Sequence, residues 1–260
     1  MAEAAAVSCP APSLSLVVPC YNEAENIRRG VLATIGAFTA DDERFREVLI
    51  VDDGSTDESR ELIANAARRF PKFALMANRH QGKALAIIAG IQRARSEFAM
   101  FSDMDLATPL TEAEKLIAEA RRGHDIVIGS RQTERRGAPL HRRVLAWGLL
   151  VIRDHLLGLD DLRDTQCGFK LFRRLVALDI IRRLRVFTST RRAFGSSVSA
   201  AFDLEFLLIA TQLGYRITEV PVVWQHVENR SVRVVKDSLE TLADIVRIAY
   251  FARTHRYTQA

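Results

Sequence analysis

Short apolar runs alternate with longer amphipathic stretches through the first half of the chain. Three of the runs have the length and composition of buried strands and pass directly into acidic or other polar residues. They are the run that starts at Leu14, the run that starts at Glu47, and the run 98–102. Apolar residues at helical spacing follow the first two runs, at Ile27, Val31, Leu32 and Ile35 and at Leu62, Ile63 and Ala66. This alternation predicts right-handed βαβ units and a parallel sheet.

The same patterns predict the remaining elements, more weakly after residue 131. Strands are expected at 73–76, 125–129 and 216–224, and helices at 83–94, 110–121 and 202–213. Residues 132–140 contain Gly137 and Pro139 and predict a loop, whereas 141–159 and 232–252 are candidate amphipathic helices. We therefore expect one domain over 14–240, with a disordered lead-in at 1–13 and a C-terminal amphipathic helix and tail at 241–260.

The positive charge of the chain indicates the kind of partner that it binds and says little about the fold. The chain has 260 residues, 48% of them hydrophobic and 27% charged, which is ordinary for a globular protein. Its net charge of +5 comes largely from arginine clusters at 131–143 and 182–192, which suit nucleic acid, anionic lipid or phosphorylated substrates. Few aromatic residues are interleaved with these arginines, so a non-enzymatic nucleic-acid binder is only a remote alternative and no nucleic acid is expected as a partner.

Other classes are disfavoured by the same sequence. The three cysteines are widely spaced and form no Cys-x-x-Cys pair, which disfavours a zinc site or a disulfide framework and fits a reducing compartment. Residues 1–13 lack the basic start of a secretory signal. The longest uncharged apolar run, 144–152, has nine residues, against roughly 20 for a membrane span. We therefore expect a cytoplasmic protein, peripheral at most on the cytoplasmic face of a membrane.

Two carboxylates, Asp103 and Asp105, follow the apolar run 98–102. A buried strand that ends in Asp-x-Asp places hard oxygen ligands at its exposed end, and a cation held by one or two carboxylates takes its other ligands from water and substrate phosphates. The other two runs also end in acids, and such ends converge at the carboxyl edge of a parallel sheet, where open α/β sheets bind ligands. The sequence therefore predicts a site for a divalent cation at this edge.

These segments, followed in order by 129–131, 164–172, 202–205 and 219–224, resemble family 2 glycosyltransferases, which have the GT-A fold. The ordered set is similar to the dolichyl-phosphate and polyprenyl-phosphate hexosyltransferases, with 164–170 (Asp-Thr-Gln-Cys-Gly-Phe-Lys) most like the glucosyltransferase branch. The resemblance implies a single α/β domain with a Rossmann-like, mostly parallel sheet flanked by helices. Within it, 14–130 would bind the nucleotide sugar and 131–240 the acceptor.

The implied activity is an inverting, metal-dependent transfer of a hexose, glucose favoured and mannose next, to a polyprenyl or dolichyl phosphate. The donor would be UDP-glucose or GDP-mannose, which the sequence does not separate. A second hypothesis keeps the enzyme class but gives it a soluble or protein-borne hydroxyl acceptor.

The resemblance also implies roles for single residues. Mg²⁺ or Mn²⁺ would bind to Asp103 and Asp105, with Met104 between them at the donor. Ala107 stands where some mannosyl relatives have a glutamine ligand, so the third protein ligand stays open. Base and ribose would meet Pro19, Tyr21, Glu23 and one of Asp52 and Asp53; which of the two is undecided.

The remaining predicted site residues lie in the second half of the chain. Arg131 would contact phosphate, Gln166 and Lys170 the sugar nucleotide, and Gly168 would permit close backbone approach. Asp203 and Glu205 occupy the place of a general base, which an ionised phosphate acceptor does not need. A basic segment that would close over the diphosphate contains His226, Arg230, Arg233 and Lys236.

A basic amphipathic face is predicted at 142–159, where several apolar residues lie beside Arg142, Arg143 and Arg153. Such a helix can lie in the bilayer interface. The same apolar stripe can equally pack on the sheet or form a dimer contact, and the sequence leaves these alternatives open.

Overall fold

The structure is a computed structural model that describes residues 11–131, 152–188, 201–225 and 234–258, with only the backbone described over 234–239. Most of the predicted lead-in, the predicted loop at 132–140 and the first part of the predicted helix at 141–159 lie outside the described residues. The same holds for His226, Arg230, Arg233 and the side chain of Lys236.

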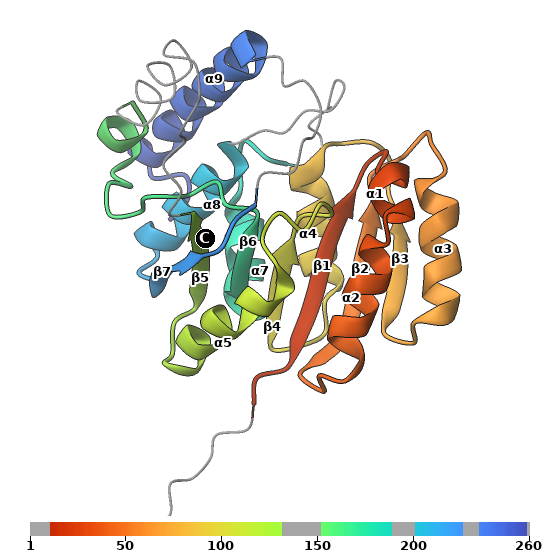
Figure 1. The fold of residues 1–260 in the computed structure, drawn as a ribbon. Coiled ribbons are helices and arrows are strands. Elements are labelled where there is room, and N and C mark those ends of the chain that lie inside the picture. Colours follow the sequence, from red (N-terminus) through yellow and green to blue (C-terminus); the bar gives the residue numbers. More distant parts are fainter. Residues whose placement is uncertain (1–10, 132–151, 189–200, 226–233, 259–260) are drawn as a thin grey trace, which may run out of the picture.

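The described residues form one mixed sheet of seven strands in the order β3-β2-β1-β4-β6-β5-β7 (Figure 1). Strands β1 to β4 are mutually parallel and β7 is parallel to β5, whereas β6 runs antiparallel to both of its neighbours, β4 and β5. The predicted mostly parallel sheet is confirmed. The strands are β1 (Leu14–Cys20), β2 (Phe45–Asp52), β3 (Phe73–Ala77), β4 (Phe98–Ser102), β5 (Ile126–Arg131), β6 (Phe169–Arg173) and β7 (Ile217–Val222).

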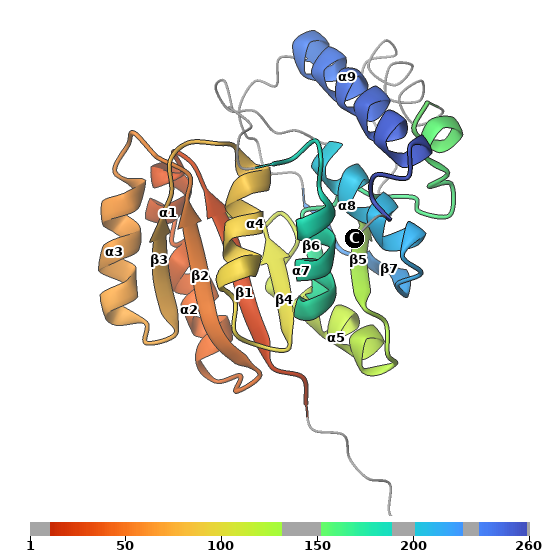
Figure 2. The same cartoon turned by 180° about the vertical axis from the view of Figure 1, so that it is seen from behind.

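Helices cover both faces of the sheet (Figures 1 and 2). One face carries α1 (Ala24–Arg28), α2 (Val31–Ala40), α3 (Ser59–Arg69) and α5 (Ala113–Arg121), which follows the short 3-10 turn Leu110–Glu112. The other face carries α4 (Lys83–Arg93), α7 (Arg174–Arg183) and α8 (Ala201–Gln212), and α9 (Val234–Arg253) lies beyond α8. Helix α9 packs on α8 and crosses the boundary expected at residue 240.

Burial on both faces explains why the central strands read as continuous apolar runs. In β2, Val48 and Ile50 pack into the core under α1, α2 and α5, while Leu49 and Val51 pack into the core under α4. Alternate residues of a strand point to opposite faces, so a strand covered on both sides needs apolar residues throughout. In β1 and β2 this run stops at the carboxyl edge, where Cys20 lies opposite Asp52.

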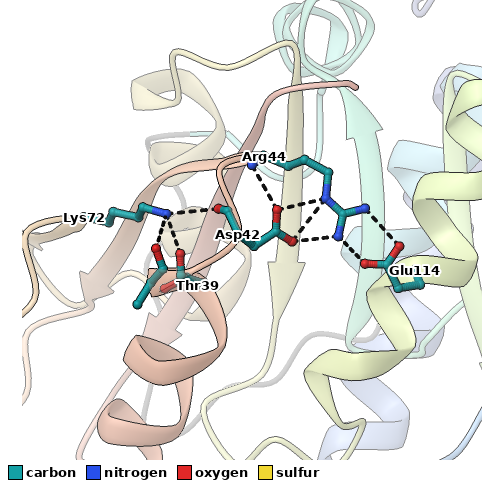
Figure 3. Close-up of polar contacts among 6 residues, drawn as sticks. Thr39, Asp42, Arg44, Lys72 and Glu114 are labelled. Carbon is teal, nitrogen blue, oxygen red and sulfur yellow. Dashed lines mark hydrogen bonds and ion pairs between the residues drawn. The ribbon is translucent and has the colours of Figure 1, made fainter. Parts of the chain in front are cut away.

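At the amino edge of the sheet, charged side chains are paired with one another (Figure 3). Arg44 donates to Asp42 through Nε, at 2.9 Å from Oδ1, and to Glu114 on α5 through Nη1, at 2.9 Å from Oε2. Hydrogen bonding to Arg44 holds the pKa of Asp42 below its usual range. Lys72 donates to the last carbonyls of α2 and its turn, at 3.1 Å from Ala40 O and 3.0 Å from Asp42 O. This network closes the end of the sheet opposite the predicted site.

The part of the 141–159 segment that the structure describes packs inward. Residues 152–157 are helical, and Ile152 and Leu156 pack against the core. Arg153 is 5% exposed and contacts Asp154, with Nη1 3.4 Å from Thr165 Oγ1. Of the alternatives left open for this segment, its described part favours packing on the protein, because the Arg153 guanidinium is enclosed by protein. Arg142 and Arg143 lie outside the described residues.

None of the helices in the described ranges is both long and apolar enough to cross a membrane.

Candidate active site

Asp103 and Asp105 lie where the sequence places them, directly after β4 at the carboxyl edge of the sheet. Asp105 accepts a hydrogen bond from the Ala107 backbone, with Oδ1 3.1 Å from N. The Oδ1 atom of Asp103 is buried and lies 2.5 Å from Nζ of Lys83. Asp103 and Lys83 therefore form a close ion pair.

Lys83 is the first residue of α4, and the acidic side chains of the site surround its ammonium group. Burial alone would lower the pKa of Lys83, but the charge of Asp103, followed by those of Asp203 and Asp105, outweighs burial and raises that pKa. Its side chain also lies over the Phe101 ring, with Nζ 5.7 Å from the ring centroid. The ammonium is thus a firmly charged group facing the predicted metal ligands.

Gly168 shows why the motif at 164–170 needs a glycine. Strand β6 pairs with β4 so that Phe169 lies opposite Ser102, and this register brings Gly168 against Asp103. The Asp103 N–H donates to Gly168 O at 3.2 Å. A Cβ at Gly168 would stand 2.0 Å from Asp103 Oδ2. The close approach at Gly168 is therefore made to the carboxylate of Asp103, one of the two predicted metal ligands.

A second lysine–aspartate pair lies beside the first. Lys170, on β6, is 1% exposed and donates to Asp203 Oδ1 at 2.8 Å and to Cys167 O at 2.6 Å. Its Nζ lies 5.3 Å from the centroid of Phe101, the ring that Lys83 also contacts. Both of these pairs balance a buried or half-buried positive charge against a carboxylate at the carboxyl edge.

Tyr21 and His80 stack on each other at this edge. Their ring centroids are 4.1 Å apart and the rings are inclined by 16°. The carboxylate of Asp53 holds the loop that carries His80, because it accepts from the backbone N–H groups of Gln81 (2.9 Å) and Gly82 (2.8 Å) and lies 2.8 Å from His80 Nδ1. Asp53 thereby links the end of β2 to the start of α4 and positions the aromatic pair.

Asp52 is buried and engaged elsewhere. It accepts from the Ser55 N–H at 3.1 Å and from Nε of Arg60 at 2.7 Å. Asp52 and Asp53 thus both have protein partners, and the sequence does not decide which of them contacts the base. The contact with the base stays a prediction for each.

Glu23 lies beside Tyr21 at the start of α1. It accepts from the Asn26 side chain at 2.7 Å, and its own N–H donates to Ser59 Oγ at 2.7 Å. Pro19 is buried within β1. Met104 is 3% exposed with its side chain in the core, so a contact of Met104 with the donor would have to come from its backbone.

Arg131 ends β5 and is held by Asp164. Two parallel bonds join them, Nε to Oδ2 and Nη2 to Oδ1, both 2.7 Å long. Burial would raise the pKa of Asp164, but its bonds with Arg131 lower it. Asp164 in turn is fixed by Glu219 on β7, which accepts its N–H at 2.9 Å. The Arg131 guanidinium also lies 5.7 Å from the Trp224 ring centroid.

Gln166 is exposed, between this ion pair and Gly168. Its predicted contact with the sugar is not tested by the structure.

The structure gives Glu205 a full set of protein partners. Its carboxylate is fully buried and accepts from the Arg185, Val186 and Phe187 N–H groups at 2.7, 2.8 and 3.0 Å and from the Tyr257 hydroxyl at 2.9 Å. Burial raises its pKa, while the same hydrogen bonds oppose that rise. This environment favours a structural role over that of a general base.

The described cysteines are not activated. Burial, with the charge of Asp52 next, raises the pKa of Cys20 to about 12, and burial raises that of Cys167 to about 11. A thiol is nucleophilic only as the thiolate. Cys167 is 0% exposed, which confirms its expected place as a small buried hydrophobe.

The donor set fits a hard divalent cation. Asp103 offers a carboxylate that already attracts the ammonium ion of Lys83, and Asp105 adds a second carboxylate. Within the described residues, no third His, Cys, Asp or Glu joins them in a metal-binding cluster. Two carboxylates suit Mg²⁺ or Mn²⁺ when water and substrate phosphates supply the remaining ligands.

Reasoning from the sequence missed Lys83, His80 and Asp164. Lys83 had a usable signal, since a cation at the start of a helix that follows a parallel strand lies at the same edge as Asp103. The partners of His80 and Asp164, by contrast, come from other strands and carry no signal in their own segments.

Comparison with known proteins identifies the family of the chain. The family model described as glycosyl transferase family 2 matches residues 15–180. The chain is 33% identical over 253 residues to "Dolichyl-phosphate beta-glucosyltransferase ALG5A" of Trichomonas vaginalis, covering 92% of this chain and 74% of that protein. It is 28% identical over 269 residues to the dolichyl-phosphate beta-glucosyltransferase of Saccharomyces cerevisiae, covering 94% and 76%.

Among solved structures, the fold is similar to that of glucosyl-3-phosphoglycerate synthase from Mycobacterium tuberculosis in complex with Mn²⁺, UDP-glucose and phosphoglyceric acid. The TM-score is 0.67 at 16% sequence identity, over 92% of this chain and 80% of that chain. At this identity the likeness concerns the fold.

Proposed function

The chain belongs to glycosyl transferase family 2, and from this premise we propose that it transfers glucose from UDP-glucose to a dolichyl or other polyprenyl phosphate. Membership confirms the resemblance read from the sequence and makes the chain a nucleotide-sugar-dependent hexosyltransferase. The observation that carries the choice of sugar and acceptor is the alignment with dolichyl-phosphate beta-glucosyltransferases, which covers 92% and 94% of this chain for the two relatives described above.

The donor is held through its diphosphate and its base. Asp103 and Asp105 hold Mg²⁺ or Mn²⁺, which when bound offsets the charge that develops on the departing nucleoside diphosphate. The ammonium of Lys83, next to Asp103, is placed to contact the same phosphates. Tyr21, stacked on His80, presents an aromatic ring to the base.

Transfer inverts the anomeric configuration. An acceptor phosphate oxygen attacks the anomeric carbon opposite the bond to the nucleoside diphosphate, so an α-linked donor gives a β-linked product. Because a phosphate monoester has a second pKa near about 6, this oxygen is ionised at pH 7 and needs no general base. The full set of hydrogen bonds on Glu205 supports this proposal, because a carboxylate that is engaged with protein donors does not act as a general base.

A lipid-phosphate acceptor places the enzyme at a membrane surface, and we assign it as peripheral on the cytoplasmic face. Co-sedimentation with liposomes that contain anionic lipid tests this assignment. Binding that falls with rising salt supports it, and no binding at low salt contradicts it.

The activity is tested with UDP-glucose and GDP-mannose, each offered to a short-chain polyprenyl phosphate and to a panel of hydroxyl acceptors. We expect mass spectrometry to detect polyprenyl-phosphate glucose from UDP-glucose, with no transfer in excess EDTA. Transfer only to hydroxyl acceptors would replace the proposed acceptor, and transfer only from GDP-mannose would replace the proposed donor.

A further inference from the structure

Lys83 and a divalent cation compete for the same oxygen. Asp103 Oδ1 is buried and lies 2.5 Å from Lys83 Nζ. A Mg²⁺ ion bound to that oxygen would lie about 2.1 Å from it. Two positive charges so close to one oxygen and to each other repel strongly. This repulsion weakens cation binding as long as the ammonium stays on Asp103.

The Asp103 side chain is 31% exposed although its Oδ1 is buried, so its exposure lies on the Oδ2 side, and a cation bound to Oδ2 would still stand close to the Lys83 ammonium. Oδ2 faces Gly168, so closely that even a Cβ at that position would stand 2.0 Å from it. The carboxylate is also tied to β6 through its own backbone, since the Asp103 N–H donates to Gly168 O. Asp103 is consequently held in place, and the flexible lysine is the partner that can move.

Displaced from Asp103, the ammonium needs a new anion. Among the acids whose charges act on Lys83, Asp203 already accepts from Lys170 at 2.8 Å, and Asp105 is the second predicted cation ligand. A diphosphate placed against Asp103 and Asp105 would supply the missing negative charge. The four-carbon stem of a lysine allows its ammonium to shift between such neighbouring anions.

We infer that Lys83 is an internal counterion of Asp103 that passes to the donor diphosphate, so that the divalent cation binds tightly only together with the nucleotide. This inference rests on the proposed function, because it needs a cation and a diphosphate in the same site. In the free enzyme Lys83 neutralises Asp103, and in the donor complex it neutralises phosphate. The affinities of cation and nucleotide are thereby coupled, and such coupling is reciprocal.

The test measures Mn²⁺ binding by the electron paramagnetic resonance signal of the free ion, with and without UDP or GDP. We expect the unmodified chain to bind Mn²⁺ weakly alone and much more tightly with nucleotide. Lys83→Met should bind Mn²⁺ alone at least tenfold more tightly than the unmodified chain, and should bind UDP alone about tenfold more weakly. The factor by which UDP increases Mn²⁺ affinity should fall about tenfold.

Two variants serve as controls. Lys83→Arg keeps a positive charge beside Asp103 and should retain weak nucleotide-free binding of Mn²⁺. Lys72→Met removes a lysine at the opposite edge of the sheet (Figure 3) and should bind Mn²⁺ like the unmodified chain. Thermal unfolding of every variant identifies any that fail to fold, and Lys83→Gln replaces Lys83→Met if the latter does.

The outcomes separate the two proposals. Equal nucleotide-free Mn²⁺ affinity in the unmodified chain and in Lys83→Met overturns the counterion inference and leaves the proposed transferase intact. No Mn²⁺ binding by either chain, even with UDP or GDP, overturns both the inference and the metal dependence of the proposed function.

Discussion

Replacing Glu205 tests whether this buried acid organises the fold or acts on the substrate. Oε1 accepts from the N–H groups of Arg185 and Val186 and from the Tyr257 hydroxyl, and Oε2 accepts from the Phe187 N–H. The carboxylate thus joins α8 to the segment that follows α7 and to the residues after α9. Three variants remove increasing numbers of these hydrogen bonds: Tyr257→Phe, Glu205→Gln and Glu205→Ala.

The expected losses follow from the number of donors left without an acceptor. Tyr257→Phe removes one neutral donor, at a cost of about 1 kcal/mol. Glu205→Gln keeps an oxygen that accepts from Arg185, Val186 and Tyr257. Its amide N–H₂ then faces the Phe187 N–H, so that two donors meet without an acceptor, which costs about 1–3 kcal/mol. Glu205→Ala strands three backbone N–H groups and a hydroxyl in the interior, and should cost about 4 kcal/mol or more.

These free energies convert to melting temperatures at about 2–4 °C per kcal/mol for a chain of this size. Differential scanning fluorimetry should therefore show Tm reductions of about 3, 5 and 10 °C or more, in the order Tyr257→Phe, Glu205→Gln, Glu205→Ala. Below these temperatures, initial rates of glucose transfer per folded molecule should change less than threefold in Tyr257→Phe and Glu205→Gln.

A general base would behave differently. If Glu205→Gln kept its Tm but lost transfer by a factor of about 100 or more, Glu205 would act on the acceptor and the structural assignment would be wrong. That result would also favour a hydroxyl acceptor, since an ionised phosphate needs no base.

Three further predictions concern the site. Gly168→Ala should abolish transfer while keeping most of the stability, because its Cβ displaces Asp103; unchanged rates would contradict the close approach. Asp105→Ala should remove transfer with a Tm within about 2 °C of the unmodified chain, since a strand-end carboxylate adds little to the core; turnover in this variant would exclude a metal role. Asp164→Asn should lower the stability at pH 7, because it removes the charge that pairs with Arg131; the unmodified chain loses the same stabilisation as pH falls through the lowered pKa of Asp164, so acid titrations of the two proteins should converge at low pH.

The sequence by itself determined the strand–helix alternation of the first half and the place of its acids. Strands buried on both faces require unbroken apolar runs, and such runs are visible without any knowledge of their neighbours. Because parallel strands joined by helices end at one edge, Asp52, Asp53, Asp103 and Asp105 could be assigned to that edge from their positions alone.

Strand β6 and helix α7 escaped prediction for a physical reason. The strand Phe169–Arg173 is only five residues long and carries a lysine at its second position. A buried lysine is tolerated there because Asp203, from α8, accepts its charge. That compensation comes from a residue 33 positions away and leaves no trace in the local pattern.

The tertiary structure alone decided which charges meet. The antiparallel insertion of β6 beside β4 sets Gly168 against Asp103, the start of α4 brings Lys83 to the same carboxylate, and the end of the chain closes over Glu205. Hydrophobic periodicity fixes the face on which a residue lies, but the partner of a charged group depends on strand register and on segments distant in sequence. A sequence therefore predicts that an acid stands at the site, and only the folded chain determines whether it binds a cation, a lysine or backbone N–H groups.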